Sequence, residues 1–475
     1  MKRISLLFLI LLAVAALGGG GWLLFHDRTD PIVVLEPLTA FVSPGLPMQV
    51  RASDADSGIR HMAVSVTTGN QTYTILDKRY DGAPTTVEER FTLEPYKIPD
   101  GDVVIDIAVS DGSYARFGRG NVQVVASKHV MDTIKPTVSV QSTQHHVRQG
   151  GPGLVVYTVS EPAAKTGVQV GERFFPGYAQ GGGKYACFFA FPHDMDPKAF
   201  APVLFADDAA GNRAVAAFTV TAIPRTFRRD TINVTDNLIN KIDSEFASLV
   251  PGQMGALERY VRVNREVRLA NDTLLLEVGL RTSPLPLWSG AFRRMPGAPM
   301  ARFADHRTYI YNGQEVDQQT HMGQDIASTA NADVPAGNHG TVVFAGYLGI
   351  YGNMVMLDHG LGLQSMYAHL SEMHVQEGDE VAKGQVIGKT GFTGMALGDH
   401  LHFAIYVSGV PVSPIEWWDS SWIKNNIKDR LALPEKVDPA REEAEDAAAN
   451  AAAEQAASPA KKPAKPQKPA AKNKQ

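Results

Sequence analysis

The sequence predicts a mainly β, multidomain protein with one helical segment, and three observations lead to this prediction. The chain has 475 residues, more than a single hydrophobic core usually holds. Short alternating or β-branched runs, broken by Gly, Pro, Asp and Ser, fill the first half and are typical of antiparallel sandwiches. Only the stretch from about 226 to 282 changes to a helical period.

The first segment, residues 1–29, predicts export. Lys2 and Arg3 precede an apolar stretch from Ile4 to Phe25, which is long enough for a membrane-spanning helix. The two basic residues are expected to stay in the cytoplasm. We therefore expect a signal anchor and a cell-envelope protein held by a single pass in the inner membrane, with its remainder in the periplasm. Ala13-Val-Ala15 offers an alternative in which the segment is cleaved.

Two similar β-sandwich modules are expected at 30–131 and 132–225. The first opens at Pro31-Ile-Val-Val-Leu35 and the second at Pro136-Thr-Val-Ser-Val140, and each closes on a strand, an Asp-rich turn and another strand. This loose duplication has a period of roughly 100 residues. The two segments resemble bacterial immunoglobulin-like modules. We expect them to act as spacers or as docking arms for other cell-envelope proteins.

A helical connector is expected at 226–282. Five apolar residues fall on one helical face, and a second helical pattern follows the break at Pro251-Gly252. The five residues are Leu238, Ile239, Ile242, Phe246 and Val250. A stripe of this kind usually packs against a neighbouring domain. At the other end of the chain, residues 435–475 are rich in Ala, Lys and Pro, which predicts a disordered tail.

Composition excludes some classes of function. The net charge of -5 gives no reason to expect nucleic acid as a partner. Cys187 is the only cysteine and lies in an apolar run, so a disulfide framework and a cysteine-based zinc cluster are both excluded. Any metal in this chain must be held by His and carboxylate side chains.

Four histidines and one aspartate stand out in the second half of the chain. They occur in His321-Met-Gly-Gln-Asp325, in Tyr367-Ala-His369-Leu370 and in His400-Leu-His402-Phe403. In an extended strand, residues two apart point to the same side, so His400 and His402 are expected to share one face. Gly323 favours an extended loop in which His321 and Asp325 turn toward one point.

This set of residue types predicts a catalytic zinc site. One Asp and two His supply three ligands that zinc accepts and leave a fourth position for water. Bound zinc lowers the pKa of that water to about 7 and polarises a carbonyl group under attack. Hydrolysis of a peptide also needs a proton acceptor and a group that stabilises the oxyanion, and the two remaining histidines could supply these.

From Trp288 to about Trp418 the chain resembles the lysostaphin-type, or LytM-type, zinc metallopeptidase domain of peptidoglycan hydrolases. Besides the three histidine motifs, the resemblance runs through Gly340-Thr-Val-Val-Phe-Ala-Gly346, Tyr351-Gly-Asn-Met-Val355, Asp358-His-Gly360, Gly378-Asp379, Lys383-Gly-Gln-Val-Ile-Gly388 and Thr393-Gly394. It implies an antiparallel-β domain at 283–420. It also implies that His321, Asp325 and His402 bind Zn²⁺, while His369 and His400 orient water and stabilise the transition state. Asp399 departs from the proline that often precedes His400 in such domains.

The sequence therefore predicts a zinc-dependent endopeptidase that hydrolyses peptide bonds in the stem or cross-bridges of peptidoglycan. The alternative is a regulatory LytM-type protein that activates a cell-wall amidase or a division partner and hydrolyses little itself. A third hypothesis is a peptidase kept inactive by a connector or module residue that covers the groove. A phosphate-binding loop at Gly388-Lys-Thr390 is excluded, because Lys383 stands where the leading glycine of that motif belongs.

Overall fold

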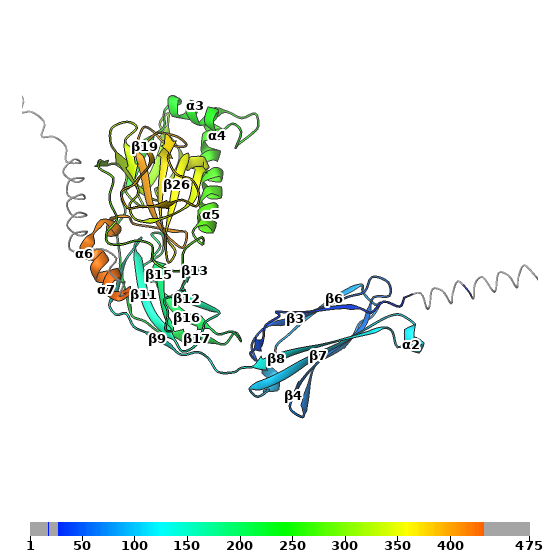
Figure 1. The fold of residues 1–475 in the computed structure, drawn as a ribbon. Coiled ribbons are helices and arrows are strands. Elements are labelled where there is room, and N and C mark those ends of the chain that lie inside the picture. The colour runs from blue at the N-terminus through cyan, green and yellow to red at the C-terminus, as the bar shows by residue number, and fades with distance from the viewer. Residues whose placement is uncertain (1–17, 19–26, 432–475) are drawn as a thin grey trace, which may run out of the picture. The chain divides into compact units, whose positions relative to one another are not determined.

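The computed structural model describes residue 18 and residues 27–431, a chain dominated by β-strands (Figure 1). The expected anchor at 1–29 lies almost wholly outside the described residues, and the expected tail at 435–475 lies entirely outside them. Within the described ranges, no helix has both the length and the apolar character needed to cross a bilayer.

The chain divides into two units. One unit holds the described residues up to Val138 together with Val159–Thr166 and Phe205–Val215. The other holds Ser139–Thr158, Gly167–Leu204 and the described residues from Ala216 onward. The segment 132–225 contributes to both units, and the module boundaries that we expect from the sequence stay predictions.

The first 105 or so described residues form two sheets around one core. The first sheet has the order β1-β3-β6, with β1 Ile32–Glu36, β3 Met48–Ser53 and β6 Thr86–Phe91. The second has the order β2-β8-β7-β4-β5, with β2 Phe41–Val42, β8 Val122–Met131, β7 Gly101–Asp111, β4 Ile59–Thr68 and β5 Gln71–Arg79. Alternate residues of β7 are buried, as expected for strands with one face on a core. Two short helices, η1 Glu94–Tyr96 and α2 Ala115–Gly118, lie in the connections.

The next segment forms three further sheets, in the orders β14-β15-β11-β9, β13-β12-β16-β17 and β10-β18. Their strands are β9 Val138–Val140, β10 His145–Arg148, β11 Pro152–Val159, β12 Lys165–Val170, β13 Arg173–Pro176, β14 Tyr178–Ala179, β15 Lys184–Ala190, β16 Val203–Asp207, β17 Arg213–Ala216 and β18 Val220–Ile223. Cys187 lies on β15 and is fully buried. The prediction of a β-rich protein is confirmed, whereas the immunoglobulin-like character of the two segments stays a prediction.

The connector contains the expected helices and one strand that the helical period did not predict. Helix α3 (Asp236–Glu245) begins where the Thr235 side chain accepts a hydrogen bond from the Leu238 amide. After the break come α4 (Ala256–Arg262), the π-helical η2 (Val263–Val267) and α5 (Arg268–Val278). The strand is β19 (Arg229–Asn233), which pairs in parallel with β21 (His306–Tyr311). With β22 (Gln314–Thr320) they form the sheet β19-β21-β22.

The second half is built on an eight-stranded antiparallel sheet in the order β20-β23-β31-β27-β26-β25-β29, with β32 paired to β31. Its strands are β20 Ala298–Pro299, β23 Gln324–Ala327, β25 Gly340–Tyr347, β26 Asn353–Gly360, β27 Leu363–Leu370, β29 Glu380–Val381, β31 Leu401–Val407 and β32 Val410–Val412. A smaller sheet, β24-β30-β28, comprises β24 Asp333–Pro335, β30 Val386–Lys389 and β28 Glu372–Met373. The remaining elements are β22 Gln314–Thr320, η3 Gly349–Tyr351, η4 Ile415–Trp418, α6 Ser420–Ile423, η5 Lys424–Lys428 and α7 Asp429–Leu431.

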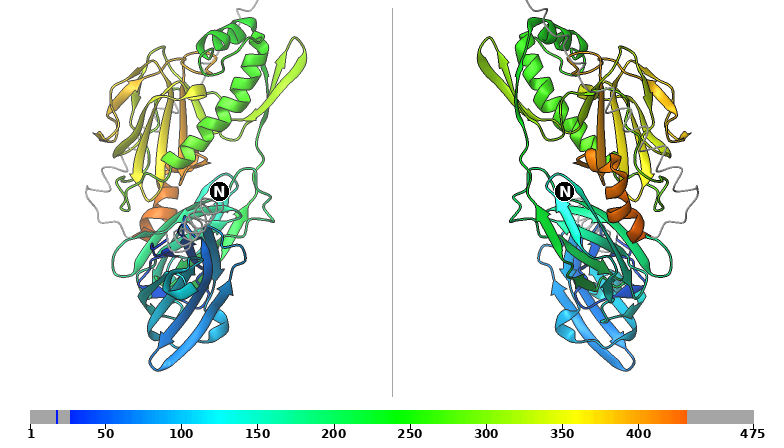
Figure 2. Two further views of the ribbon diagram at one scale, coloured as in Figure 1. Left: turned by 90° about the vertical axis from the view of Figure 1, so that its right-hand side faces the viewer. Right: turned by 90° about the vertical axis from the view of Figure 1, so that its left-hand side faces the viewer.

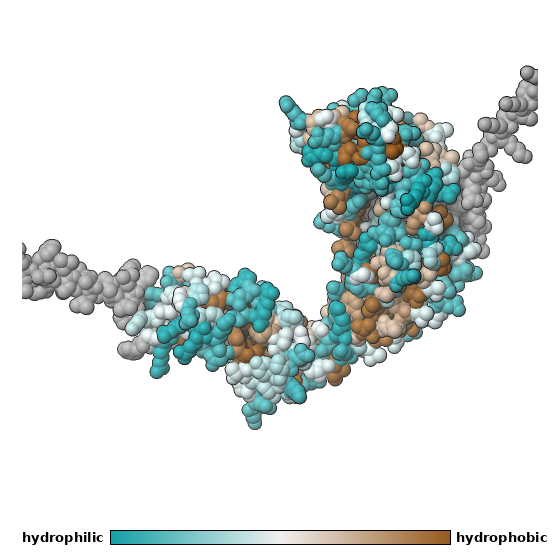
Figure 3. Space-filling view, turned by 180° about the vertical axis from the view of Figure 1, so that it is seen from behind, coloured by the Kyte–Doolittle hydropathy of each residue, from teal (hydrophilic) through white to brown (hydrophobic). Residues whose placement is uncertain are grey.

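The connector helices cover one face of this large sheet (Figures 1 and 2). Ile242 and Phe246 of the predicted stripe share a buried core with Met356, Met366 and Ala404 of the sheet. The expectation that the stripe packs against its neighbour is therefore confirmed. Apolar residues on the surface lie in several patches between polar ones (Figure 3), and Leu38 is the most exposed of the large apolar side chains in the described ranges.

Candidate metal centre and active site

Two paired strands place Asp325 and His402 opposite each other. Strand β23 runs antiparallel to β31, and Asp325 is the direct cross-strand partner of His402. His321 lies in the short loop that joins β22 to β23. Residues directly opposite in an antiparallel pair have neighbouring side chains, so this register brings together residues 77 positions apart in the chain.

Three potential ligand atoms converge at one point. Nε2 of His321 lies 2.9 Å from Oδ1 of Asp325 and 2.9 Å from Nδ1 of His402, and Nδ1 of His402 is also 2.9 Å from Oδ1 of Asp325. All three side chains are buried. Two imidazoles and one carboxylate match the donor set of a three-ligand zinc site, so these residues fit the metal that the sequence predicts.

The protonation states of Asp325 and His402 suit metal binding. Burial alone would raise the pKa of Asp325, but His321 and His402 outweigh it and hold that pKa well below the ordinary value. Burial lowers the pKa of His402 to about 4, against the opposing effect of Asp325. At neutral pH the cluster therefore offers an ionised carboxylate and a neutral His402 imidazole, the forms that bind metals.

Gly323 is required by the close approach of the loop to the cluster. A Cβ atom at this position would lie 2.6 Å from the carbonyl oxygen of Phe403 and 2.7 Å from the ring of His402. Any larger residue would push the loop off the ring and displace His321 and Asp325.

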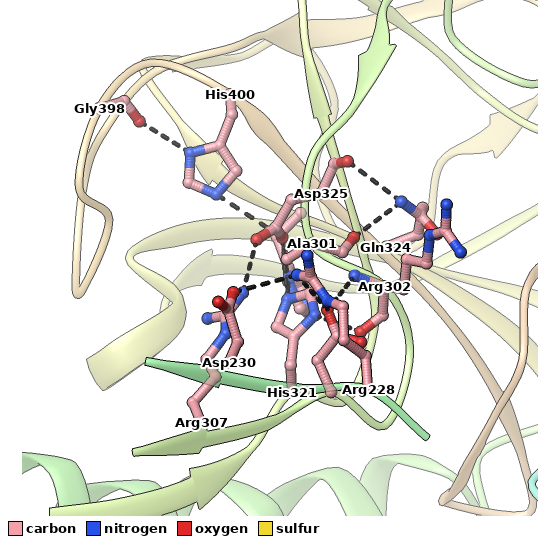
Figure 4. A network of polar contacts seen from close by, with 12 residues as sticks. Arg228, Asp230, Ala301, Arg302, Arg307, His321, Gln324, Asp325, Gly398 and His400 are labelled. Carbon is pink, nitrogen blue, oxygen red and sulfur yellow. Dashed lines mark hydrogen bonds and ion pairs between the residues drawn. The ribbon is translucent and has the colours of Figure 1, made fainter. Parts of the chain in front are cut away.

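A second layer of contacts fixes the orientation of His321. The carbonyl of Arg302 lies 3.0 Å from Nδ1 of His321. Because a carbonyl can only accept, Nδ1 carries the proton and Nε2 is left to face the cluster. The His321 amide donates to the Asp305 carbonyl at 3.0 Å, and the Asp305 carboxylate accepts from Arg228 Nη2 at 2.7 Å. Figure 4 shows Arg228 and Arg302 close to His321.

His369 and His400 stand beside the cluster. Their ring centroids are 4.9 Å apart, and that of His369 is 5.8 Å from the ring of His402. Nδ1 of His369 donates to the carbonyl of Thr393 at 2.9 Å, and Nδ1 of His400 donates to that of Gly398 at 2.7 Å. Nε2 of each ring is thereby left to face the cluster, and that of His400 lies 3.7 Å from Oδ1 of Asp325.

His369 combines two features typical of a functional residue. Its φ is +64°, a left-handed conformation that non-glycine residues rarely adopt and that is enriched at active sites. Burial, together with the neighbouring His400 and His402 rings, holds its pKa well below the ordinary value. The imidazole is therefore neutral at physiological pH and can accept a proton.

A cavity of about 480 Å³ opens beside these residues. All five sequence-predicted site residues line it. Its remaining wall includes connector residues, among them Arg228, Asp230 and Tyr260, and also Arg307 from β21. Nη2 of Arg307 donates to Oδ2 of Asp325 at 3.1 Å.

Sequence reasoning brought out the five central residues but missed Arg228, Asp305 and Arg307. The missed residues occur in no recognisable motif. The one local signal near them was the alternation of Ile232 and Val234, which could have indicated β19.

Comparison with known proteins agrees with the resemblance seen in the sequence. Residues 319–414 match the sequence model of Peptidase family M23. Over 95 residues the chain is 42% identical to "DD-carboxypeptidase/endopeptidase Mpg" of Neisseria meningitidis serogroup B strain MC58, a match that covers 20% of this chain and 22% of that protein. Over 116 residues it is 34% identical to "Peptidoglycan DD-endopeptidase ShyA" of Vibrio cholerae serotype O1, covering 24% of this chain and 25% of that protein.

The matched part spans about a quarter of the length of these curated relatives. Among solved structures, the catalytic domain of the antimicrobial peptidase lysostaphin from Staphylococcus simulans is 27% identical, with a TM-score of 0.20. That match covers 27% of this chain and 90% of the lysostaphin domain.

Proposed function

Because residues 319–414 form a peptidase M23 domain, we propose that this protein is a zinc-dependent endopeptidase that hydrolyses peptide bonds in the stem or cross-bridges of peptidoglycan. The observation that supports this proposal best is the convergence of His321, Asp325 and His402, with the rings of His369 and His400 beside them. The names of two relatives, a DD-carboxypeptidase/endopeptidase and a peptidoglycan DD-endopeptidase, support the choice of substrate.

His321, Asp325 and His402 would hold the zinc ion. When bound, zinc supplies a Lewis acid that polarises the scissile carbonyl and acidifies water. Asp325 contributes its negative charge through Oδ1, while Oδ2 is held by Arg307. The Arg302 carbonyl keeps His321 in the tautomer that presents Nε2.

His369 and His400 would carry out the proton transfers. The low pKa of His369 keeps its Nε2 unprotonated, so this atom can accept a proton from the attacking water. The hydrogen bonds from Nδ1 to Thr393 and Gly398 fix both rings, so neither side chain has to reorganise during the reaction. His400 would stabilise the negative charge that develops on the carbonyl oxygen.

The place of action follows from the substrate. We propose that the protein works in the cell envelope, on the outer side of the inner membrane. The expected N-terminal anchor would hold it there, and the two N-terminal β segments would contact envelope proteins.

The proposal is tested by incubating the full chain with purified peptidoglycan sacculi. The expected result is release of muropeptides with new peptide ends, which stops when a chelator is added and is absent for His402→Ala. A surface variant such as Arg281→Ala should behave as wild type, because Arg281 and its partner Glu377 are both more than half exposed. If zinc binds in stoichiometric amount and no product appears, the regulatory alternative becomes the better explanation.

A further inference from the structure

The cavity beside the metal cluster has a wall that the M23 match does not include. Arg228, Asp230 and Arg268 line it from the connector, and Arg307 lines it from β21. All four residues lie before residue 319, where the match begins. This part of the cavity wall therefore comes from outside the matched segment.

Arg307 is the guanidinium closest to the cluster. Its side chain is only 18% exposed, and its one ion pair among the described residues is with Oδ2 of Asp325, at 3.1 Å. Its Nε is buried and has no hydrogen-bond partner within the described chain. That atom is not reached from the cavity, but the Arg307 side chain lines the cavity and keeps part of its surface exposed, so its outer N–H groups can meet an acceptor that enters.

The other arginines of the wall are already engaged. Arg228 is paired with the buried carboxylate of Asp305 and with Asp230. Arg268 donates to the backbone and side-chain oxygens of Asn264. Arg307 differs from both, because its one anionic partner in the described part of the chain is Asp325, a carboxylate that would also bind the metal.

The charge balance favours an anion at this point. When a divalent ion binds the cluster, the single negative charge of Asp325 faces both the ion and the guanidinium. Positive charge is then in excess inside a partly buried cavity, where electrostatic interactions are stronger than in water. The fork of N–H donors on Arg suits a carboxylate in particular.

We propose that Arg307 binds a free carboxylate of the peptide substrate, on a residue next to the cleaved bond. This inference rests on the proposed peptidase function and names the substrate class of that site: peptides with a free carboxylate close to the scissile bond. The position follows from the 3.1 Å contact to Asp325, which places the guanidinium directly beside the metal cluster where the bond would be attacked.

The test uses two synthetic peptides that end in D-alanyl-D-alanine, one with a free terminal carboxylate and one with a terminal carboxamide. Their binding to the zinc-saturated full chain is measured by calorimetry for wild type, Arg307→Gln and the surface control Arg281→Gln. Where a peptide is cleaved, kcat/KM replaces the binding constant. We expect wild type and control to prefer the carboxylate by about tenfold to a hundredfold, the range of a charge-assisted hydrogen bond. In Arg307→Gln the preference should fall to near unity.

Three results would overturn the inference. Wild type could show no preference for the carboxylate. Arg307→Gln could retain the full preference, which would assign the carboxylate to the metal or to another group. Arg307→Gln could also lose affinity for both peptides by the same factor, which would mean that Arg307 only positions Asp325. If the carboxylate preference depends on Arg307 but sacculi stay intact, the inference survives and the proposed activity on peptidoglycan fails.

Discussion

Arg228 offers the sharpest test of how the connector supports the metal centre. The structure predicts that Arg228→Ala weakens zinc binding, although the hydrogen bonds of this side chain go to Asp305 and Asp230 and not to the three ligand residues. Arg228 donates to Oδ2 of Asp305 through Nε at 3.1 Å and Nη2 at 2.7 Å. The carbonyl of Asp305 accepts from the His321 amide, and the Asp305 carboxylate also accepts from the Arg302 amide.

The size of the effect follows from these contacts. The Asp305 carboxylate, in a residue that is 1% exposed, accepts two hydrogen bonds from Arg228 and one from the Arg302 amide. Removal of Arg228 leaves only the bond from the Arg302 amide among these three. Two charge-assisted hydrogen bonds are lost, and since Arg228 is half exposed we expect a cost of about 2 kcal/mol rather than the larger value of a fully buried pair. The loop at 302–305 then holds His321 less firmly, and loss of such an outer contact typically weakens metal binding by about 10- to 100-fold.

The assay is competition for zinc between the protein and a chromophoric chelator at fixed pH. Arg281→Ala serves as the control, because it removes an exposed arginine with an exposed partner. A zinc affinity of Arg228→Ala equal to that of the control would refute the reasoning. It would show that the loop at 302–305 keeps its position without the connector.

Three further outcomes can be measured on the same protein. His369→Ala should bind zinc as wild type does but lose activity by roughly 100-fold or more, the usual contribution of a general base; normal muropeptide release would disprove its role. Burial raises the pKa of Glu416 to about 7 in the folded protein, above its value in the unfolded chain. The free energy of unfolding should therefore fall by about 3 kcal/mol as the pH rises from 4.5 to 7, and should not change further through this group above pH 7. Glu416→Gln should abolish that part of the pH dependence in thermal unfolding, and an unchanged profile would contradict it. Ile242→Ala should cost about 2–5 kcal/mol in chemical unfolding, because Ile242 is fully buried between α3 and the sheet; a loss below 1 kcal/mol would mean that the helix is not firmly packed.

The sequence allowed the central residues to be predicted because their spacing reflects local geometry. His400 and His402 are two apart at the start of an extended strand, and His321 and Asp325 flank a glycine that the backbone needs for close approach. The helical stripe could also be predicted, because its apolar residues, such as Leu238 and Ile242, recur with the period of the helix that they occupy. In each case the information lies within a few residues of the chain.

The rest of the site could not be read from the sequence because it depends on contacts between distant segments. Strand β19 has five residues and pairs with a strand that begins 77 positions later, so its partner is set by the tertiary fold. Arg228 and Asp305 are also 77 residues apart, and neither belongs to a periodic pattern. An arginine of this kind looks like any solvent-exposed charge until the fold places it beside a buried carboxylate.

The way in which the connector enters the cavity also bears on the hypothesis of a peptidase kept inactive. Connector residues Arg228, Asp230 and Tyr260 line the cavity, but the hydrogen bonds that the side chains of Asp325 and His321 accept or donate outside the cluster go to Arg307 and to the Arg302 carbonyl, which lie beyond the connector. An element that only blocked the site could be removed with a gain in activity. This connector also covers a face of the sheet through Ile242 and Phe246 and stabilises the loop behind His321 through Arg228. Truncation to 283–420 would therefore expose the apolar face and loosen the metal site, and we expect it to lower activity on sacculi rather than raise it.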